Sequence, residues 1–384
     1  MVLRSVDQLP RMEAVADSWR ALEKRSGTPL SYFQTYDWCR AWVETFAGPG
    51  SGREIFIQTA WRGDDMVAVW PLMLCSRTGL RHVATLGDPY TQYSNVIFDP
   101  TRMSEREFEG FVIKALQSAR ADVAAFDAVP ARAALARQLG IHPGSVTGQD
   151  NESLVLDLTA WPSSEAYAAS LGRDQRRRRE RRRRALARHG ELSFEILWPN
   201  NPEFKPLVHR AIEMKRDWLR STGRLNIGMM AGAEEFFSKL SGSEEDLSGA
   251  VMSVLRAGGD VVAVEIGFLQ NRHYYGHIGS FDSAFAELSP GKIQVEMTIR
   301  WLIDQGMRSY DWLANATDTK RALSSFSEPL KSFAVPFSWK GRLYAEAWLP
   351  NVKPGIKRAY YALPSSIRRV MTGAQSILTM LFLI

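Results

Sequence analysis

A carboxylate interrupts an apolar run in the second half of the chain. Glu265 lies within Val-Val-Ala-Val-Glu-Ile-Gly-Phe, where a strand would remove its side chain from water. Burial disfavours the charged form and raises the pKa of a carboxyl group, which makes Glu265 the first candidate for a general base. The alternative is a strand carboxylate that faces solvent or pairs with an arginine.

A histidine and two tyrosines in the next apolar stretch can also carry a proton. His277 lies mid-strand and is a second candidate base, with a packed core histidine as the alternative. Tyr274 and Tyr275 are adjacent on a strand, so only one of them can face a cleft. We assign Tyr275 as a candidate acid and Tyr274 as a candidate lining residue of an acceptor site; aromatic packing is the alternative for both.

Two aspartates and a lysine are candidates for positioning an acceptor. Asp282 follows the tyrosine strand in a polar loop, where ordinary turn chemistry is the alternative. Asp311 lies on a later short strand and could orient an acceptor or pair with Lys320 or Arg321. Lys320 is included among the candidate substrate-binding residues.

Most of these candidate residues lie on a continuous series of predicted elements between residues 250 and 313. The series comprises strands at 251–255, 261–269 and 273–279, a polar loop at 280–288, a helix from Ser289 to a stop at Gly306, and a strand at 309–313. Gly258-Gly259-Asp260 provides the turn between the first two strands.

The helix start at Ser289 predicts an anion site. Serine at the cap and Pro290 at the first helical position are a recognised start signal. A helix that opens from a strand loop offers unpaired N–H groups and the positive end of its dipole, which suit a pyrophosphate. The predicted cofactor-binding residues are Leu288, Ser289, Gly291 and Lys292.

The positive charge of the chain is concentrated in one segment. Residues 173–188 hold ten arginines against Asp174 and Glu180, a net charge of +8, which leaves −2 for the rest of a chain whose total is +6. The segment predicts a helix that ends near Gly190. It is either a solvated helix or a binding surface, through residues such as Arg177 and Arg181, for a cofactor phosphate, a lipid pyrophosphate or an acidic glycan.

Composition limits the class of protein. A chain of 384 residues with 45% hydrophobic residues predicts a globular protein of two domains. Two cysteines, Cys39 and Cys75, disfavour a disulfide framework and favour a reducing cytoplasm. We find no metal-ligand spacing, signal peptide or apolar run long enough for a spanning helix. Nucleic acid is disfavoured as a partner because no reading motif accompanies the arginines.

The order of elements repeats within the chain. A hairpin at 55–61 and 66–75, a strand at 81–86, a helix at 104–119 and a strand at 123–126 precede the similar series that begins at residue 251. This repeat predicts two similar α/β domains, each a mixed, mostly antiparallel sheet flanked by helices. The predicted domains are 1–155 and 156–345, followed by a basic amphipathic tail at 346–384. The tail either docks onto protein or lies at a membrane interface.

Several of these segments together resemble the CelD-type GNAT acyltransferases linked to bacterial polysaccharide synthesis, which are related to the tandem-GNAT FemAB group. They are Phe33-Gln-Thr-Tyr-Asp-Trp-Cys-Arg-Ala-Trp42, the arginine run, His209 with Met214-Lys-Arg-Asp-Trp218, Tyr274-Tyr-Gly-His-Ile-Gly-Ser-Phe-Asp282, Leu288-Ser-Pro-Gly-Lys292, and Tyr310-Asp311 with Lys320. The resemblance covers roughly residues 30–340 and implies an acyl-CoA donor, most often acetyl-CoA, without a metal. The implied acceptor is an amine or hydroxyl group on a sugar, in a bacterial exopolysaccharide or its nucleotide- or lipid-linked precursor.

The cofactor segment departs from the usual pattern of that family. Many members have Q/R-x-x-G-x-G/A before the helix, whereas this chain has Ala286-Glu-Leu-Ser-Pro-Gly291, and only Gly291 fits. Two other functions stay open: a FemAB-like transferase that uses aminoacyl-tRNA, and a non-catalytic GNAT scaffold controlled by an anionic ligand. The expected location is the cytoplasm, including the inner face of the membrane.

Overall fold

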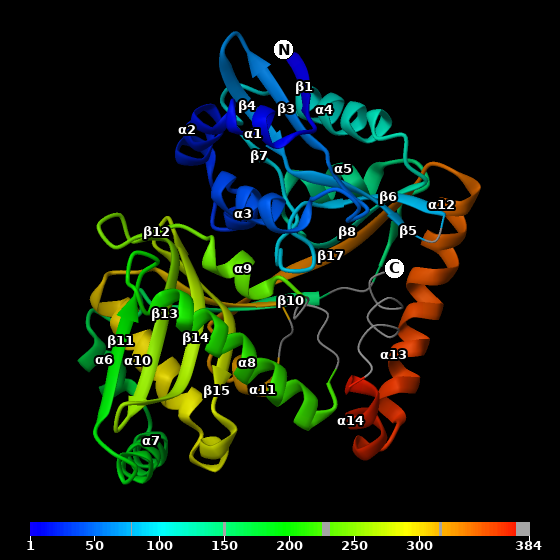
Figure 1. Ribbon diagram of the computed structural model, residues 1–384. Helices are drawn as coiled ribbons and strands as arrows, with labels where there is room; N and C mark the ends of the chain where they lie inside the picture. Colours follow the sequence, from blue (N-terminus) through cyan, green and yellow to red (C-terminus); the bar gives the residue numbers. More distant parts are fainter. Residues whose placement is uncertain (78, 149–150, 225–230, 315–316, 374–384) are drawn as a thin grey trace. The chain divides into compact units, whose positions relative to one another are not determined.

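The computed structural model describes residues 1–77, 79–148, 151–224, 231–314 and 317–373 (Figure 1). These residues form two compact units. Unit 1 comprises Met1–Glu152 and Glu328–Arg368, and unit 2 comprises Ser153–Ser327 and Arg369–Gly373. The first predicted boundary lies close to this division. The second does not, because residues 328–345 fold with unit 1.

The sheet of unit 2 contains the predicted series of strands. In spatial order it comprises β11 (Leu192–Leu197), β13 (Ser248–Ala257), β14 (Asp260–Gln270), β15 (His273–Phe281), β16 (Ser309–Ala314) and β10 (Asn151–Asp157), with β12 (Gly242–Ser243) paired to β13. Neighbouring strands are antiparallel except β15 and β16, which are parallel. The parallel pair needs a long connection, and a helix provides it.

Helices cover both faces of this sheet. They are α6 (Ser164–Ser170), α7 (Arg173–Ala187), α8 (Phe204–Thr222), α9 (Ala233–Ser238), α10 (Pro290–Asp304) and α11 (Asp318–Arg321), with a 3-10 helix η2 (Ser283–Leu288) in the predicted polar loop. Figure 1 shows α8 and α10 on opposite faces, and both contact β14 and β15. On the α10 face, Leu269 and Tyr310 pack with Ile299 and Leu302 of the helix.

Two glycines allow α7 to end against the hairpin between β13 and β14. A side chain on Gly190 would lie 2.3 Å from the Gly258 Cα, and both residues have positive φ. Only glycine accepts both the conformation and the approach without strain. The arginine helix is therefore fixed at its C-terminal end.

Unit 1 has two sheets. One contains β1 (Val2–Val6), β3 (Ile57–Arg62), β4 (Asp65–Trp70) and β7 (Ile97–Phe98). The other contains β17 (Phe326–Pro336), β8 (Val123–Pro130), β6 (Leu80–Thr85), β5 (Leu72–Arg77) and β2 (Arg53–Ile55), with β9 (Val146–Thr147) paired to β17. The single strand predicted at 66–75 is wrong: it divides into β4 and β5 at Pro71, which has no N–H to donate to a ladder.

The helices of unit 1 bury a core of aromatic and aliphatic side chains. They are α1 (Leu9–Glu13), α2 (Ala16–Ser26), η1 (Tyr32–Gln34), α3 (Tyr36–Phe46), α4 (Glu105–Ser118) and α5 (Ala134–Ile141). Phe108, Phe111 and Leu116 of α4 pack with Trp70 and Phe126 of the strands. The predicted start of α4 is confirmed, because Ser104 and Glu107 form a reciprocal capping box.

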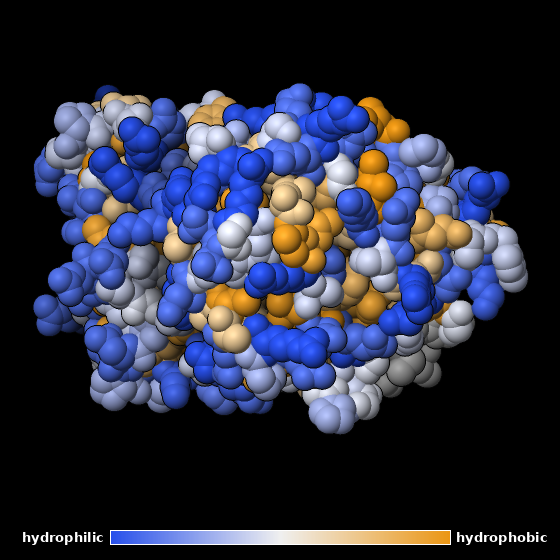
Figure 2. Space-filling model, turned by 90° about the horizontal axis from the view of Figure 1, so that it is seen from above, coloured by the Kyte–Doolittle hydropathy of each residue, from blue (hydrophilic) through white to orange (hydrophobic). Residues whose placement is uncertain are grey.

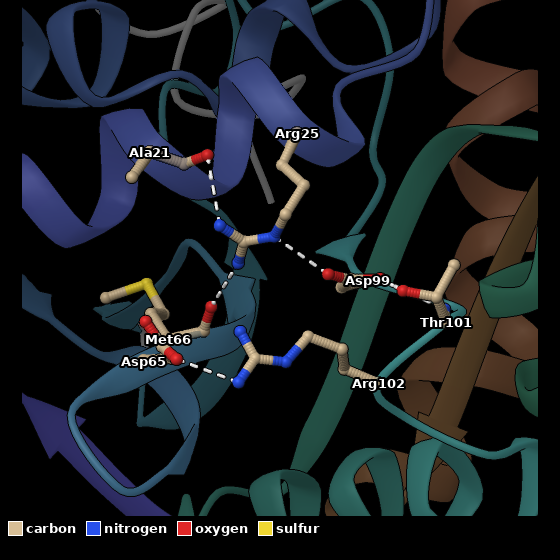
Figure 3. Close-up of polar contacts among 7 residues, drawn as sticks. All are labelled: Ala21, Arg25, Asp65, Met66, Asp99, Thr101 and Arg102. Carbon is tan, nitrogen blue, oxygen red and sulfur yellow. Dashed lines mark hydrogen bonds and ion pairs between the residues drawn. The ribbon is translucent and has the colours of Figure 1, made fainter.

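A polar network ties α2 to strands of unit 1 (Figure 3). The Arg25 Nε donates to Asp99 Oδ2 at 2.8 Å, and its Nη2 donates to the Met66 carbonyl at 3.0 Å. Asp99 also accepts from the Thr101 hydroxyl at 2.6 Å. Burial opposes the charged carboxylate, but the hydrogen bonds from Thr101 and Arg25 outweigh it and lower the pKa of Asp99.

The two units confirm the repeat predicted from the sequence. In unit 1 the parallel pair β6–β8 flanks α4 along the chain, as the parallel pair β15–β16 flanks α10 in unit 2. The α/β fold with two mixed, mostly antiparallel sheet domains is therefore as predicted. The hairpin β3–β4 differs, since it joins the separate sheet of unit 1.

The last described segment is largely helical. It contains α12 (Trp339–Leu343), the π-helix η3 (Tyr344–Val352), α13 (Lys353–Ala362) and α14 (Ser365–Gly373). The last part of the predicted tail, 374–384, lies outside the described residues. Among the helices that the structure describes, none is long and apolar enough to cross a membrane. On the face shown in Figure 2, apolar side chains form patches separated by hydrophilic ones.

Candidate active site

Glu265 is held by two buried tyrosines. The hydroxyl groups of Tyr274 on β15 and Tyr310 on β16 both donate to Glu265 Oε1, at 2.8 Å and 2.6 Å. The Glu265 side chain belongs to the α10 face of the sheet, where 5% of the residue is exposed. The solvent-facing alternative for Glu265 is therefore wrong. The second carboxylate oxygen, Oε2, lies toward Gly279, which presents no side chain to it.

Two strand glycines make room for the tyrosine rings. A Cβ on Gly267 would lie 2.2 Å from the Tyr274 hydroxyl, and a Cβ on Gly276 would lie 2.5 Å from the Tyr310 hydroxyl. Glycine in a strand interior lacks a side chain to pack and often marks such a close approach. The sequence contained this signal, since each glycine interrupts an apolar strand, but the sequence analysis did not use it.

Further polar groups continue the network beneath Glu265. Ser253 is the cross-strand partner of Glu265 on β13 and accepts a hydrogen bond from the Gln294 side chain of α10 at 2.5 Å. The same Gln294 amide donates to the Thr298 hydroxyl at 2.9 Å. Buried polar groups are costly unless they are hydrogen-bonded, so this network fixes the position of Glu265 relative to α10.

The parallel strands separate next to this carboxylate. The register of β15 and β16 runs from His273–Ser309 to Tyr275–Asp311 and ends there, although β15 continues to Phe281. His277 forms a bulge against β14 at this point. The divergence leaves strand backbone beside Glu265 that is not engaged in the β15–β16 ladder.

Two lysines lie near Glu265. From the sequence, Lys320 was a candidate for substrate binding and Lys215 had no assigned role in the site. The ammonium of Lys215 on α8 donates to the Gly279 carbonyl at 3.1 Å, and that of Lys320 on α11 donates to the Trp312 carbonyl at 2.9 Å. The pKa of Lys215 is lowered to about 8, mainly by burial and also by the neighbouring Lys320, while Glu265 opposes the shift. Burial also lowers the pKa of Lys320.

Burial has the opposite effect on the acids. It raises the pKa of Glu265, although the hydrogen bonds from Tyr310 and Tyr274 favour the carboxylate. Burial and the Glu265 charge raise the pKa of both tyrosines. The site therefore combines an acid with a raised pKa and an amine with a lowered one, an arrangement suited to proton transfer near neutral pH.

The remaining catalytic candidates do not converge on Glu265. His277 packs between Phe237 and Phe268, with ring centroids at 5.5 Å and 5.3 Å. Phe268 and Glu265 are three residues apart on β14, so they point to opposite faces. Glu265 and His277 therefore do not form a catalytic pair, and the packed-histidine alternative describes the ring contacts.

Tyr275 and Asp311 are opposite each other in the parallel pair. Tyr275 is fully buried, and burial together with the Asp311 charge raises its pKa. Asp311 accepts from the Ser153 hydroxyl at 2.5 Å and from the Leu313 N–H at 2.8 Å. Leu313 has a positive φ, so Asp311 holds a backbone turn at the end of β16.

Asp282 and Tyr274 also have structural contacts. Asp282 caps η2 by accepting from the Ala284 N–H at 2.9 Å and pairs with Arg210 of α8 at 2.8 Å. This is the turn chemistry considered as the alternative. Tyr274 is 1% exposed, so it supports Glu265 and does not line an open acceptor site.

The N-terminus of α10 differs from its predicted form in one respect. Ser289 occupies the cap position in the left-handed conformation, and its side chain makes no capping hydrogen bond. Pro290 begins the helix as predicted, and the first turn contains no acidic residue. A Cβ on Gly291 would meet only Phe281, at 3.8 Å. Leu288, Gly291 and Lys292 lie at this positive helix end, which suits a phosphate group.

The arginine helix α7 has a buried and an exposed side. Leu186 packs with Ile293 of α10. Arg179 lies 3.3 Å from Glu296 of α10 and donates to the Tyr167 hydroxyl at 3.2 Å. Arg177, Arg178 and Arg181 are exposed, and among the described residues none of the three has an ion-pair partner.

Cysteine and metal chemistry have no geometric support here. Cys39 and Cys75 are buried without a disulfide, and burial raises the pKa of the Cys39 thiol well above its usual value. A nucleophilic cysteine needs a lowered pKa. Within the part of the chain that the structure describes, no group of three metal-ligating side chains is found.

Unit 2 thus combines a helix start without acidic residues and a buried, hydrogen-bonded carboxylate. Residues 173–321 match the family model of the acetyltransferase (GNAT) domain. The match begins at α7, ends at α11 and includes Glu265 and the start of α10. This region therefore has a GNAT-type acyltransferase fold. Comparison with curated protein sequences returns no match.

Solved structures show the same fold over most of the chain. The crystal structure of FemX has a TM-score of 0.61 at 11% identity and covers 90% of this chain and 99% of its own. The C-terminal domain of a putative lysylphosphatidylglycerol synthetase from Agrobacterium fabrum has a TM-score of 0.52 at 13% identity, covering 88% and 96%. A protein of unknown function from Bacteroides thetaiotaomicron has a TM-score of 0.51 at 10% identity, covering 87% and 99%.

Proposed function

We propose that unit 2 transfers an acyl group from an acyl-CoA, most often acetyl-CoA, to an amine or hydroxyl group of a sugar in a bacterial exopolysaccharide or its precursor. The observation that carries the proposal is the buried Glu265, held by two tyrosines beside the point where β15 and β16 separate. The GNAT-type fold of residues 173–321 supports the acyl-transfer chemistry.

The first turn of α10 fits the phosphates of CoA. It has no acidic residue, whereas the corresponding helix α4 in unit 1 has Glu105 and Glu107 in its first turn and a complete capping box. A carboxylate in the first turn satisfies the helix dipole and repels phosphate. Leu288, Ser289, Gly291 and Lys292 are the residues that would hold the donor, and CoA would supply a thioester with a good leaving group.

Glu265 would accept the proton that the acceptor loses. The acceptor nitrogen or oxygen attacks the thioester carbon, the carbon–sulfur bond breaks, and the acceptor proton moves to Glu265 directly or through water. The Oε2 side is the side toward Gly279, where no side chain intervenes. Lys215, with a pKa of about 8, can protonate the departing thiolate.

A sugar acceptor is supported by an aromatic surface near Lys215. Trp218 of α8 is half-buried, and Lys215 and Arg224 lie over its ring at 4.9 Å and 5.0 Å. An indole presents an apolar face to the C–H side of a sugar ring, while adjacent cations can bind a phosphate of a nucleotide- or lipid-linked sugar.

Calorimetry with acetyl-CoA tests the donor. We expect the wild-type protein and Gly291→Ala to bind, and Gly291→Glu not to bind, because the added carboxylate opposes the phosphates at the helix end. A Cβ at this position would meet Phe281 at 3.8 Å, an ordinary van der Waals contact, so the backbone has room for a side chain; thermal unfolding of both variants is the control for folding. Equal affinity of Gly291→Glu and wild type would exclude this site.

Transfer assays separate the remaining functions. Labelled acetyl-CoA with a panel of amino sugars and nucleotide sugars should yield acylated sugar. Binding of aminoacyl-tRNA without binding of acetyl-CoA would favour the FemAB-like alternative. If the protein neither transfers an acyl group nor binds aminoacyl-tRNA, but binds an anion at α7, the non-catalytic scaffold is favoured.

A further inference from the structure

We propose that unit 1 binds the surface of an anionic lipid bilayer through an apolar ridge formed by Trp339 and Leu343 of α12. Trp339 is 74% exposed and Leu343 is 62% exposed, whereas most large apolar side chains of the unit are buried. An exposed tryptophan next to an exposed leucine is costly in water unless it has a partner.

The orientation of the ridge follows from the packing of α12. Gly341 and Ala345 form the buried side of the helix, and a Cβ on Gly341 would lie 1.8 Å from the Asp122 carbonyl oxygen. At 100° per residue, Trp339 and Leu343 fall on the opposite side of the helix. The ridge therefore points away from unit 1.

Caps fix this orientation. The Ser338 hydroxyl accepts from the Gly341 N–H at 3.2 Å and donates to Asp122 Oδ1 at 2.5 Å. The hydrogen bond from Ser338 is the largest cause of a lowered pKa of Asp122, followed by the hydrogen bond from the Arg81 N–H. The carboxylate thus stays ionised at neutral pH and holds the start of the helix in place.

Cations flank the apolar ridge. Lys340 and Arg342 alternate with Trp339 and Leu343 along the helix, so they lie on either side of the ridge, and both are exposed. Over residues 337–368 the chain has six lysines and arginines against Glu346, a net charge of +5. A tryptophan and a leucine between basic side chains are typical of a helix that lies in the interface of an anionic bilayer.

This surface lies earlier in the chain than the tail expected at residue 346. The side chains that carry it are Trp339 and Leu343 of α12. Long cationic side chains can keep their charge at the lipid headgroups while an apolar neighbour enters the acyl boundary. The proposal does not depend on the acyltransferase function proposed for unit 2.

Sedimentation of the full-length protein with lipid vesicles tests the proposal. We expect binding to vesicles of phosphatidylcholine with roughly one-third phosphatidylglycerol, weak binding to phosphatidylcholine alone, and a decrease in binding with added salt. The double variant Trp339→Gln, Leu343→Gln should lower the partition coefficient at least about tenfold. Lys340→Gln, Arg342→Gln should weaken binding to the anionic vesicles only.

Two controls separate this ridge from other surfaces. Val2→Gln with Phe326→Gln removes exposed apolar side chains elsewhere and should leave vesicle binding unchanged. Arg177→Gln, Arg178→Gln, Arg181→Gln removes charge from α7 and should reduce binding less than the ridge variant. Unchanged binding of the ridge variant overturns the proposal. The proposal is also overturned if the wild-type protein binds no vesicles and forms a dimer that the ridge substitutions dissociate. The ridge would then contact a second copy of the chain.

Discussion

Glu265 owes its proposed role to its neighbours. A strand carboxylate with water around it keeps an ordinary pKa, whereas Glu265 is buried, accepts from Tyr274 and Tyr310, and interacts with two lysines. Burial raises its pKa and the two hydroxyl donors limit the rise. The net effect is a carboxyl group with a raised pKa, which holds a proton more tightly than a solvated glutamate does.

We expect Glu265→Gln to lower the rate of acyl transfer by at least about 10²-fold, because a general base of this kind typically contributes that much. Acetyl-CoA affinity should be unchanged. Tyr310→Phe provides the matched comparison: loss of one donor to the carboxylate raises the pKa of Glu265, so the acid limb of the kcat/KM profile should move to higher pH. If the acid limb of the profile does not move, a group other than Glu265 is responsible for it.

Glu23 in unit 1 gives a separate pH-dependent effect. Its pKa is raised to about 8, mainly by burial, although the Tyr36 N–H donates to it at 2.6 Å. The native state binds this proton more tightly than the unfolded state, so its contribution to stability is present below about pH 4.5 and is lost as the pH rises toward 8. Glu23→Gln keeps the hydrogen-bond acceptor without the charge.

We therefore expect the free energy of unfolding of Glu23→Gln to exceed that of wild type increasingly between pH 5 and pH 8. Urea unfolding at several pH values measures the difference, and groups common to both proteins cancel. Parallel pH profiles would contradict the assignment of a raised pKa to Glu23.

At the scale of elements, α7 combines two functions in one helix. Arg179 and Leu186 hold it to α6 and α10, whereas Arg177, Arg178 and Arg181 face solvent. Like charges three and four residues apart destabilise a helix. The buried side thus stabilises unit 2, and we propose that the exposed side binds an anionic ligand such as the phosphates of CoA or an acidic glycan.

We expect the triple change Arg177→Gln, Arg178→Gln, Arg181→Gln to leave the thermal stability equal or higher and to weaken binding of a phosphate-bearing ligand. The matched change Arg179→Gln should lower the free energy of unfolding by about 2–3 kcal/mol, because it leaves Glu296 buried without its partner. Thermal unfolding and calorimetry at low and high salt measure both effects. Equal stability losses in the two variants would show that the exposed arginines are structural.

At the scale of the whole molecule, the two units repeat one arrangement but differ at the helix start where we propose that the donor binds. Both have a helix between two parallel strands, yet α4 begins with a capping box and two glutamates, and α10 begins without an acidic residue. The two units therefore have similar folds, but of the two helix starts, that of α10 suits a phosphate group and that of α4 does not.

Hydrogen exchange with and without acetyl-CoA tests this asymmetry. We expect protection of residues 282–296 in unit 2, because bound phosphates engage the N–H groups of the first turn of α10. Residues 103–112 at the start of α4 should show no change. Protection at α4, or at neither helix, would contradict the placement of the donor in unit 2.

The sequence by itself determined the elements and the order of the fold. Apolar stretches predicted β13, β14 and β15, the Ser289-Pro290 signal predicted the start of α10, and the similar series of elements predicted two domains. Such signals are local, because period, caps and turns depend on residues a few positions apart. Pro71, which divides β4 from β5, and Gly267 and Gly276, which admit the tyrosine rings, are local signals of the same kind.

Only the tertiary structure decided which side chains meet. Tyr310 lies 45 residues from Glu265 in the sequence but donates to it, and Lys215 approaches from a separate helix. From the sequence, Glu265 and His277 were separate candidate bases, and the sheet directs them to opposite faces. Likewise, the exposure of Trp339 depends on how Gly341 packs against Asp122. Burial and pKa depend on neighbours that are distant in sequence, so the spacing of residues alone does not fix them.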